Sequence, residues 1–160
     1  MDFARLGQGE RVAGVSGVLL VVFMFAFNWF GLKLEAGVVA LPNEITGDAW
    51  GSYDFTDIVL FISALAAIGL ALLAASEREV RLPAASAIVA GLGLLSVLLV
   101  VISIISPPNL GGVDVSGPGI DHERKIGVWL GLIAAAGVAA GGYMAMREEE
   151  TSSGPSPPTP

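Results

Sequence analysis

The fold is decided by residues 82–106, LPAASAIVAGLGLLSVLLVVISIIS, which contain no charged side chain. At about 1.5 Å of rise per residue, a helix of this length crosses a hydrocarbon core of roughly 30 Å. The stretch therefore predicts a transmembrane helix. It ends at Ser106-Pro107-Pro108, because proline cannot continue a helix.

Three further apolar segments of similar length surround this stretch, at residues 12–32, 55–76 and 126–146. The polar turn between the second and third segments is so short that these two spans must be neighbours. We therefore predict an all-α membrane protein, an antiparallel four-helix transmembrane bundle within residues 1–147. Residues 148–160 are acidic and then rich in Pro and Ser, which predicts a disordered tail.

The first segment has an alternative interpretation, since a cleaved secretory signal also follows basic residues. Signal sequences have shorter apolar regions, of about 7–15 residues, so a retained helix is the better prediction. Aromatic side chains crowd the end of this segment and predict an interfacial belt: Phe23, Phe25, Phe27, Trp29 and Phe30. The loop that follows, residues 33–54, has room for a short strand at residues 37–41.

The overall composition supports burial in a bilayer. Hydrophobic residues make up 54% of the chain and charged residues 14%, whereas a soluble domain devotes about a quarter of its residues to charge. A chain of 160 residues is too short to hide that much apolar surface from water.

The same composition excludes several classes of function. The absence of cysteine rules out disulfides and thiolate metal sites. A formal net charge of −7 argues against nucleic acid as a partner, because that binding requires a basic surface. The paired glycines at residues 91–93 and 111–112 lack the Lys-Ser/Thr of a phosphate loop, so we expect no cofactor. The expected partners are the lipid bilayer and, in addition, the chain itself or another membrane protein.

The distribution of basic residues predicts the orientation. Four spans place both termini on one side, and loops on the cytoplasmic side carry an excess of Lys and Arg. The termini and the middle turn hold five basic residues, whereas the other two loops hold three: Arg5, Arg11, Arg78, Arg81 and Arg147 against Lys33, Arg124 and Lys125. We therefore expect the N- and C-termini in the cytoplasm.

The fourth span carries one small residue per turn on a single face, and such faces drive helix packing in lipid. The residues of this face are Gly127, Gly131, Ala135, Ala139 and Gly142. We expect them to pack within one chain, and a homodimer interface is the alternative.

Asp57 is the acidic residue that falls inside the predicted hydrocarbon boundary. A charge there usually faces a partner or a water-filled cavity. Asn28, Arg124 and Lys125 lie at the same membrane level and complete a candidate polar membrane site, suited to a proton or a cation. The simpler interpretation is a helix cap or an ion pair that fixes helix ends.

The lone histidine occurs in the sequence Asp121-His122-Glu123. Imidazole and carboxylates are ordinary metal ligands, but three adjacent loop residues rarely converge on one ion. We therefore predict no metal site and no catalytic residue.

Several local patterns occur together: FNWFG, DAWGSYDFTDIVLF, the Ser-Pro-Pro stop and GVWLGLIAAAGVAAGGYMAMREE. In this combination the chain resembles a group of uncharacterised small four-span bacterial integral membrane proteins over most of residues 8–150. The resemblance implies four helices in a bacterial inner (plasma) membrane. It assigns no activity and no functional residue.

Three hypotheses for function follow. The first is a non-enzymatic structural or accessory membrane protein that acts through helix and loop contacts. The second is a small transport or ion-conducting component that uses Asp57. The third is a membrane enzyme that acts on lipid with Asp121, His122 and Glu123 at the surface.

Overall fold

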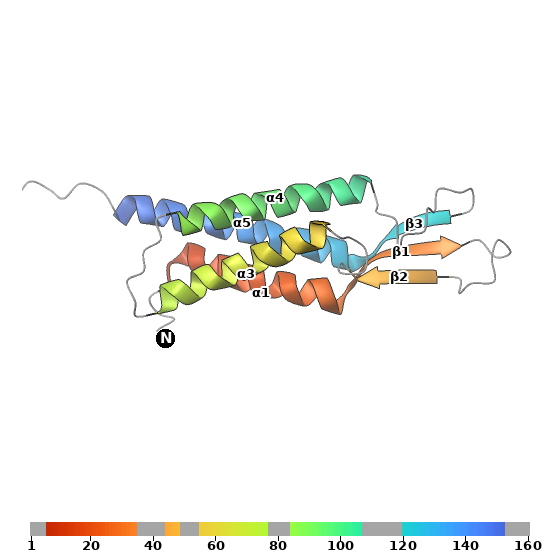
Figure 1. The fold of residues 1–160 in the computed structure, drawn as a ribbon, viewed down its shortest axis with the longest axis horizontal. Helices are drawn as coiled ribbons and strands as arrows, with labels where there is room; N and C mark the ends of the chain where they lie inside the picture. Colours follow the sequence, from red (N-terminus) through yellow and green to blue (C-terminus); the bar gives the residue numbers. More distant parts are fainter. Residues whose placement is uncertain (1–5, 35–43, 49–54, 77–83, 107–119, 153–160) are drawn as a thin grey trace, which may run out of the picture.

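The computed structural model describes residues 6–34, 44–48, 55–76, 84–106 and 120–152. Within these ranges the chain forms four helices and three strands (Figure 1). The helices are α1 (Gln8–Ala26), α3 (Phe55–Ala75), α4 (Ala85–Ile105) and α5 (Ile126–Ser152), and the strands are β1 (Asn28–Leu34), β2 (Glu44–Asp48) and β3 (Ile120–Arg124). Each of the four helices is long and apolar enough to cross a membrane. The predicted all-α four-helix architecture is therefore confirmed, with a small sheet added at one end.

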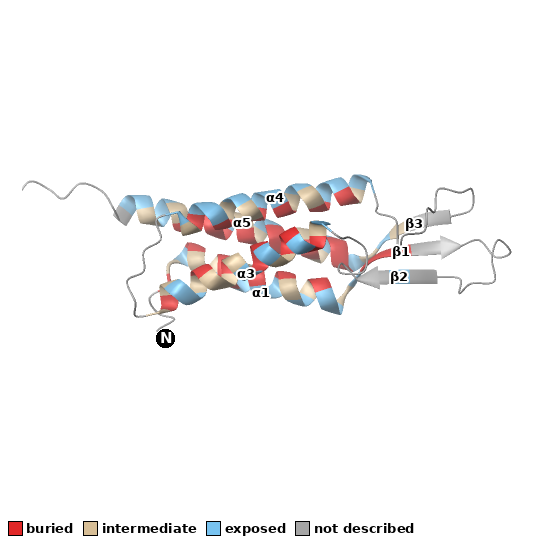
Figure 2. Ribbon diagram, viewed as in Figure 1, coloured by how far each residue is buried: buried red, intermediate tan, exposed pale blue. Residues whose placement is uncertain are grey.

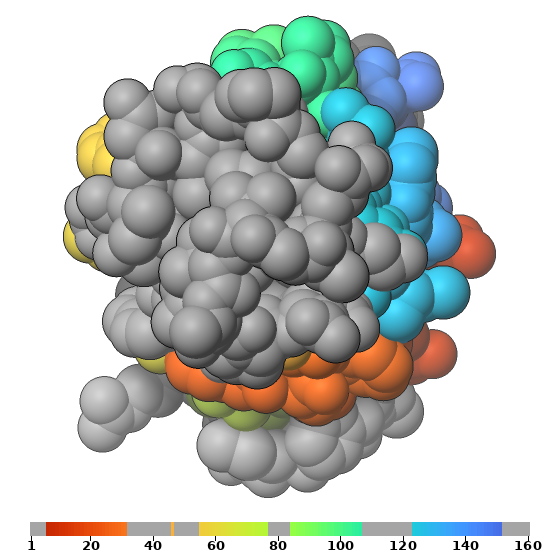
Figure 3. All heavy atoms as spheres, turned by 90° about the vertical axis from the view of Figure 1, so that its right-hand side faces the viewer, coloured from red at the N-terminus to blue at the C-terminus, as the bar shows by residue number. Residues whose placement is uncertain are grey.

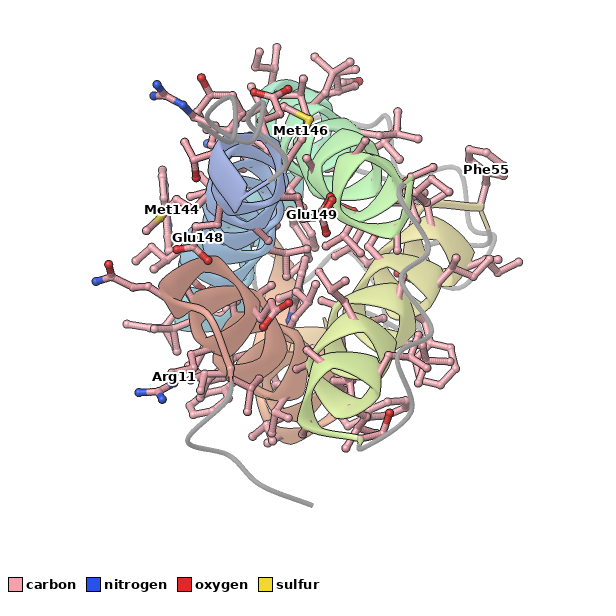
Figure 4. The ribbon with its side chains drawn as sticks, turned by 90° about the vertical axis from the view of Figure 1, so that its left-hand side faces the viewer. Arg11, Phe55, Met144, Met146, Glu148 and Glu149 are labelled. Carbon is pink, nitrogen blue, oxygen red and sulfur yellow. The ribbon has the colours of Figure 1, made fainter. Side chains whose placement is uncertain are left out.

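The helices form an antiparallel bundle in which α5 packs against both α1 and α4, and α3 closes the ring between them. The view along the bundle shows this arrangement (Figure 4). The start of α1 and the end of α5 lie at one end of the bundle, and the sheet lies at the other (Figure 1). We call these the terminal end and the sheet end.

Small residues bring the helix backbones together. Gly141 of α5 lies against the backbone of Ala13 in α1, and Gly142 lies against Ala90 in α4. Gly93 of α4 lies in turn against Ala139. A Cβ atom at any of these three glycines would overlap its neighbour, so α5 uses two small-residue faces to hold two helices. These contacts lie within one chain.

Many large apolar residues of the helices are exposed, and the burial colouring shows exposed positions along all four helices (Figure 2). The exposed fraction is 66% for Leu94, 75% for Ile105 and 69% for Ile133. Such contiguous apolar surface is unusual on a protein dissolved in water. In a membrane it is the surface that contacts lipid.

The sheet has the strand order β2-β1-β3, and both pairings are antiparallel. Gly31 of the central strand is in register with Thr46 on one side and Glu123 on the other. The sheet therefore joins the segment after α1 to the segment before α5, which are about 90 residues apart.

The prediction that the first span extends to residue 32 is wrong at its end. Helix α1 ends at Ala26, the backbone of Phe27 is extended, and β1 begins at Asn28. Aromatic residues favour strands where they pack against a neighbouring surface, and here β3 and α5 supply that surface. The strand suggested at residues 37–41 lies outside the described residues.

The prediction that the disordered tail begins at residue 148 is also wrong. Helix α5 continues to Ser152, because its acidic side chains bond to neighbouring helices and Thr151 bonds back to the carbonyl of Arg147. Residues 153–160 lie outside the described part of the chain. The second and third predicted spans agree with α3 and α4 to within a few residues.

Candidate functional site

Asp57 lies in the first turn of α3 at the sheet end, and its exposed fraction is 2%. A carboxylate in a first turn is stabilised by the positive end of the helix dipole. One turn further along α3, Leu60 belongs to the buried core that also contains Trp29, Phe30 and Val128. Asp57 is thus a buried acidic group beside the main hydrophobic core.

Two of the other predicted site residues lie at the same end with partners of their own. The guanidinium Nε of Arg124 donates to the carbonyl of Ile104, 2.8 Å away, in the last turn of α4. The ammonium of Lys125 lies 2.9 Å from the carboxylate of Glu123. The bond of Arg124 joins β3 to the last turn of α4, which is a structural role. The ion pair of Lys125 and Glu123 lies within the single segment that leads from β3 into α5.

Asn28 is the fourth residue of the predicted site, and it begins strand β1 with an exposed side chain. The structure therefore gathers Asp57, Asn28, Arg124 and Lys125 at one end of the bundle. It buries Asp57 and leaves Asn28 at the surface. Their surroundings differ too much for the four to form a single enclosed pocket.

Trp29 is the residue whose role the sequence did not predict. Its side chain is only 1% exposed, so its placement in an interfacial aromatic belt was wrong. The indole ring lies on Gly127 and Gly131, where a Cβ atom would overlap it. The predicted packing face of α5 thus accommodates a tryptophan over its first turns rather than a second helix.

Two hydrogen bonds fix this tryptophan further. The indole N–H donates to the carbonyl of Phe23, 2.8 Å away, and the backbone N–H of Lys125 donates to the carbonyl of Trp29, 3.0 Å away. Strand β1 and the start of α5 accordingly lie side by side when the molecule is viewed from the sheet end (Figure 3). We call this arrangement of Trp29 on Gly127 and Gly131 the tryptophan seat.

A pair of serines joins α3 to α4 in the interior. The hydroxyls of Ser63 and Ser96 lie 2.8 Å apart, and both side chains are fully buried. Ser63 is also 2.7 Å from the carbonyl of Val59. Because a hydroxyl has one proton, both bonds form when Ser63 donates to Val59 and accepts from Ser96. The pair is a structural hydrogen bond between two spans.

At the terminal end, two carboxylates of α5 bond to the first turns of neighbouring helices. Glu148 of α5 accepts a hydrogen bond of 3.3 Å from the backbone N–H of Gly9, in the first turn of α1. Glu149 accepts one of 2.9 Å from the hydroxyl of Ser86, in the first turn of α4. Figure 4 shows the two acids reaching toward these different helices. Each places negative charge at the positive end of a neighbouring helix dipole.

The lone histidine lies in strand β3, but the side chains of Asp121 and His122 lie outside the described part of the chain. Among the side chains that the structure describes, no three acidic or histidine groups are close enough to hold a metal ion.

Comparison with known proteins adds no family to this picture. No protein-family model matches the chain, and no curated protein matches it in sequence.

Proposed function

We propose that this protein is a non-enzymatic accessory protein of the bacterial inner membrane, in which the bundle presents the sheet to another membrane protein. The observation that carries the proposal is the tryptophan seat. Trp29 belongs to the central strand, yet it is buried against α5. The sheet is thereby packed against the membrane spans, in addition to being joined to them through the chain.

Coupling of this kind suits a contact surface. A rigid surface loses little conformational entropy on binding, and the helices fix its position relative to the bilayer. Among the described strands, β2 and β3 each pair with β1 alone, so each has one edge outside these pairings. A partner strand recognises such an edge through backbone hydrogen bonds.

A photo-crosslinking amino acid at Thr46 tests the proposal directly. Thr46 is exposed on β2, and the same probe at Ile133, 69% exposed on α5, is the matched control for random collisions in the membrane. We expect Thr46 to capture one stoichiometric protein in the native membrane. Equal capture profiles at both positions, or no capture at Thr46, would contradict the proposal.

The orientation is part of the proposal: the terminal end faces the cytoplasm and the sheet faces the opposite side. Exposed Arg11 and Arg147 at the terminal end support it. The chain has no cysteine, so single cysteines at Gln8 and Thr46 report the topology. We expect a membrane-impermeant maleimide to label Thr46→Cys in intact cells and Gln8→Cys only after lysis; the reverse pattern would reverse the orientation.

Burial of Asp57 favours a second candidate, a small transport or ion-conducting component. An acidic side chain 2% exposed near a membrane boundary is a usual feature of ion pathways. Asp57→Asn should then abolish ion flux in reconstituted vesicles while the helical content is retained, and Glu150→Gln, which changes an exposed acid at the terminal end, should leave flux intact. Equal flux in Asp57→Asn and wild type would eliminate this candidate.

A further inference from the structure

A groove of about 610 Å3 opens between α1 and α3 on the outside of the bundle. This volume lies within the range of about 300–1,000 Å3 that is typical of ligand sites. Gly14 of α1 lies against Ala71 of α3 at its floor, and Val15, Val18 and Leu72 line its sides. The groove exists because small residues bring the two backbones together while the large ones beside them turn outward.

The groove has one charged residue among the described residues that line it, Arg11. Arg11 lies in the first turn of α1, and Val18 lies seven residues further along the same helix, which is a rise of roughly 10 Å. One leaflet of the hydrocarbon core is roughly 15 Å deep. The groove thus begins at the level of the lipid headgroups and runs into a single leaflet.

The charge at the mouth of the groove points toward the lipid. Figure 4 shows Arg11 directed away from the bundle, on the other side of α1 from Glu148. Glu10, the neighbour of Arg11 in the sequence, and Glu148 of α5 accept hydrogen bonds from the backbone N–H groups of Gly7 and Gly9. A negative group that enters the groove from the bilayer meets Arg11, the charged residue among the described residues of its lining.

We propose that this groove binds one acyl chain of an anionic phospholipid, with the lipid phosphate on Arg11. A guanidinium matches the geometry of phosphate oxygens. The chain of a phospholipid descends from its phosphate into the same leaflet, as the groove descends from Arg11. Exposed apolar residues elsewhere on the bundle contact lipid in general; the groove adds a cation at the headgroup level, which selects for negative charge.

Native mass spectrometry of the full chain in detergent micelles tests the site. The probes are phosphatidylglycerol and phosphatidylethanolamine with the same acyl chains, added separately. Arg11→Gln removes the cation, and Arg147→Gln removes an exposed arginine at the same end that does not line the groove. Ala71→Leu fills the floor, and Ala140→Leu adds the same bulk on an exposed face of α5.

We expect wild type to retain phosphatidylglycerol about fivefold more than phosphatidylethanolamine, the scale of one lipid–cation contact. Arg11→Gln should lower the retention of phosphatidylglycerol to that of phosphatidylethanolamine. Ala71→Leu should lower the retention of both lipids. Both control variants should behave like wild type. Circular dichroism checks the helical content; where Ala71→Leu fails to fold, Val18→Phe on the groove wall takes its place.

Three results would overturn the proposal. One is equal retention of the two lipids by wild type, and another is unchanged phosphatidylglycerol binding by Arg11→Gln. The third is a second copy of the chain in the groove, seen as a crosslink between two copies through a cysteine at Val18.

Discussion

The two ends of the bundle are held by different forces. At the sheet end, a large aromatic side chain fills a space that two glycines leave open, and its stabilisation comes from shape and burial. At the terminal end, Glu148 and Glu149 place charge on the starts of two helices. Shape complementarity is insensitive to salt, whereas charge at a helix end is screened by it. The two ends should therefore respond to different perturbations.

Removal of the tryptophan should have the largest effect. Trp29→Ala leaves a cavity against Gly127 and Gly131 and should lower the free energy of unfolding by about 3–5 kcal/mol. Trp129, 48% exposed on α5, provides the control, since Trp129→Ala removes the same ring from the surface. Unfolding in mixed micelles, followed by circular dichroism, measures both. Similar losses of unfolding free energy in the two variants would show that the tryptophan seat stabilises the protein no more than a tryptophan at the surface does.

Neutralisation of the terminal-end acids should have a smaller, salt-dependent effect. The double variant Glu148→Gln, Glu149→Gln should cost about 1–2 kcal/mol at low ionic strength, because each residue contributes roughly one helix-end interaction. The difference should shrink in high salt. Glu150→Gln, an exposed neighbour on the same helix, is the control and should change little. A loss that is the same at all salt concentrations would argue against a charge effect.

Removal of the hydrogen bond between the two serines should have the smallest effect on the free energy of unfolding. Hydrogen bonds between membrane helices contribute about 0.6 kcal/mol on average, so a double-mutant cycle with Ser63→Ala and Ser96→Ala should give a coupling of that size. Ser103, also buried, bonds back to the carbonyl of Leu99 in its own helix. Ser103→Ala should therefore show no coupling to Ser63→Ala. Additive effects of Ser63→Ala and Ser96→Ala would mean that the bond contributes nothing.

Hydropathy along the chain predicted the four spans, because each one is a local property of about 20 consecutive residues. The strand at residues 28–34 could not be predicted in this way, since one of its two partners in the sheet and its packing surface come from residues 120–131. The helical acids at residues 148 and 149 have partners near the start of α1 and α4. In each case the deciding contact is far away in the sequence.

For the residues of the candidate polar site, the sequence predicted their level in the membrane but not their contacts. The position of Asp57 in a first helical turn followed from the apolar pattern around it, and the structure places it there. The bonds of Arg124 to Ile104 and of Lys125 to Glu123 depend on where α4 ends and on how β3 pairs. The sequence contains both residues of each pair but gives no measure of their separation.

Trp29 couples the sheet to the membrane bundle, and an electron–electron distance measurement tests this coupling most directly. Nitroxides at Thr46→Cys and Ile133→Cys, in a chain that has no other cysteine, report the distance between β2 and α5 in lipid nanodiscs. We predict one narrow distance distribution in the otherwise native chain, and a broad one when Trp29→Ala is added. A broad distribution with Trp29 present, or an unchanged narrow one without it, would show that Trp29 does not couple the sheet to the bundle.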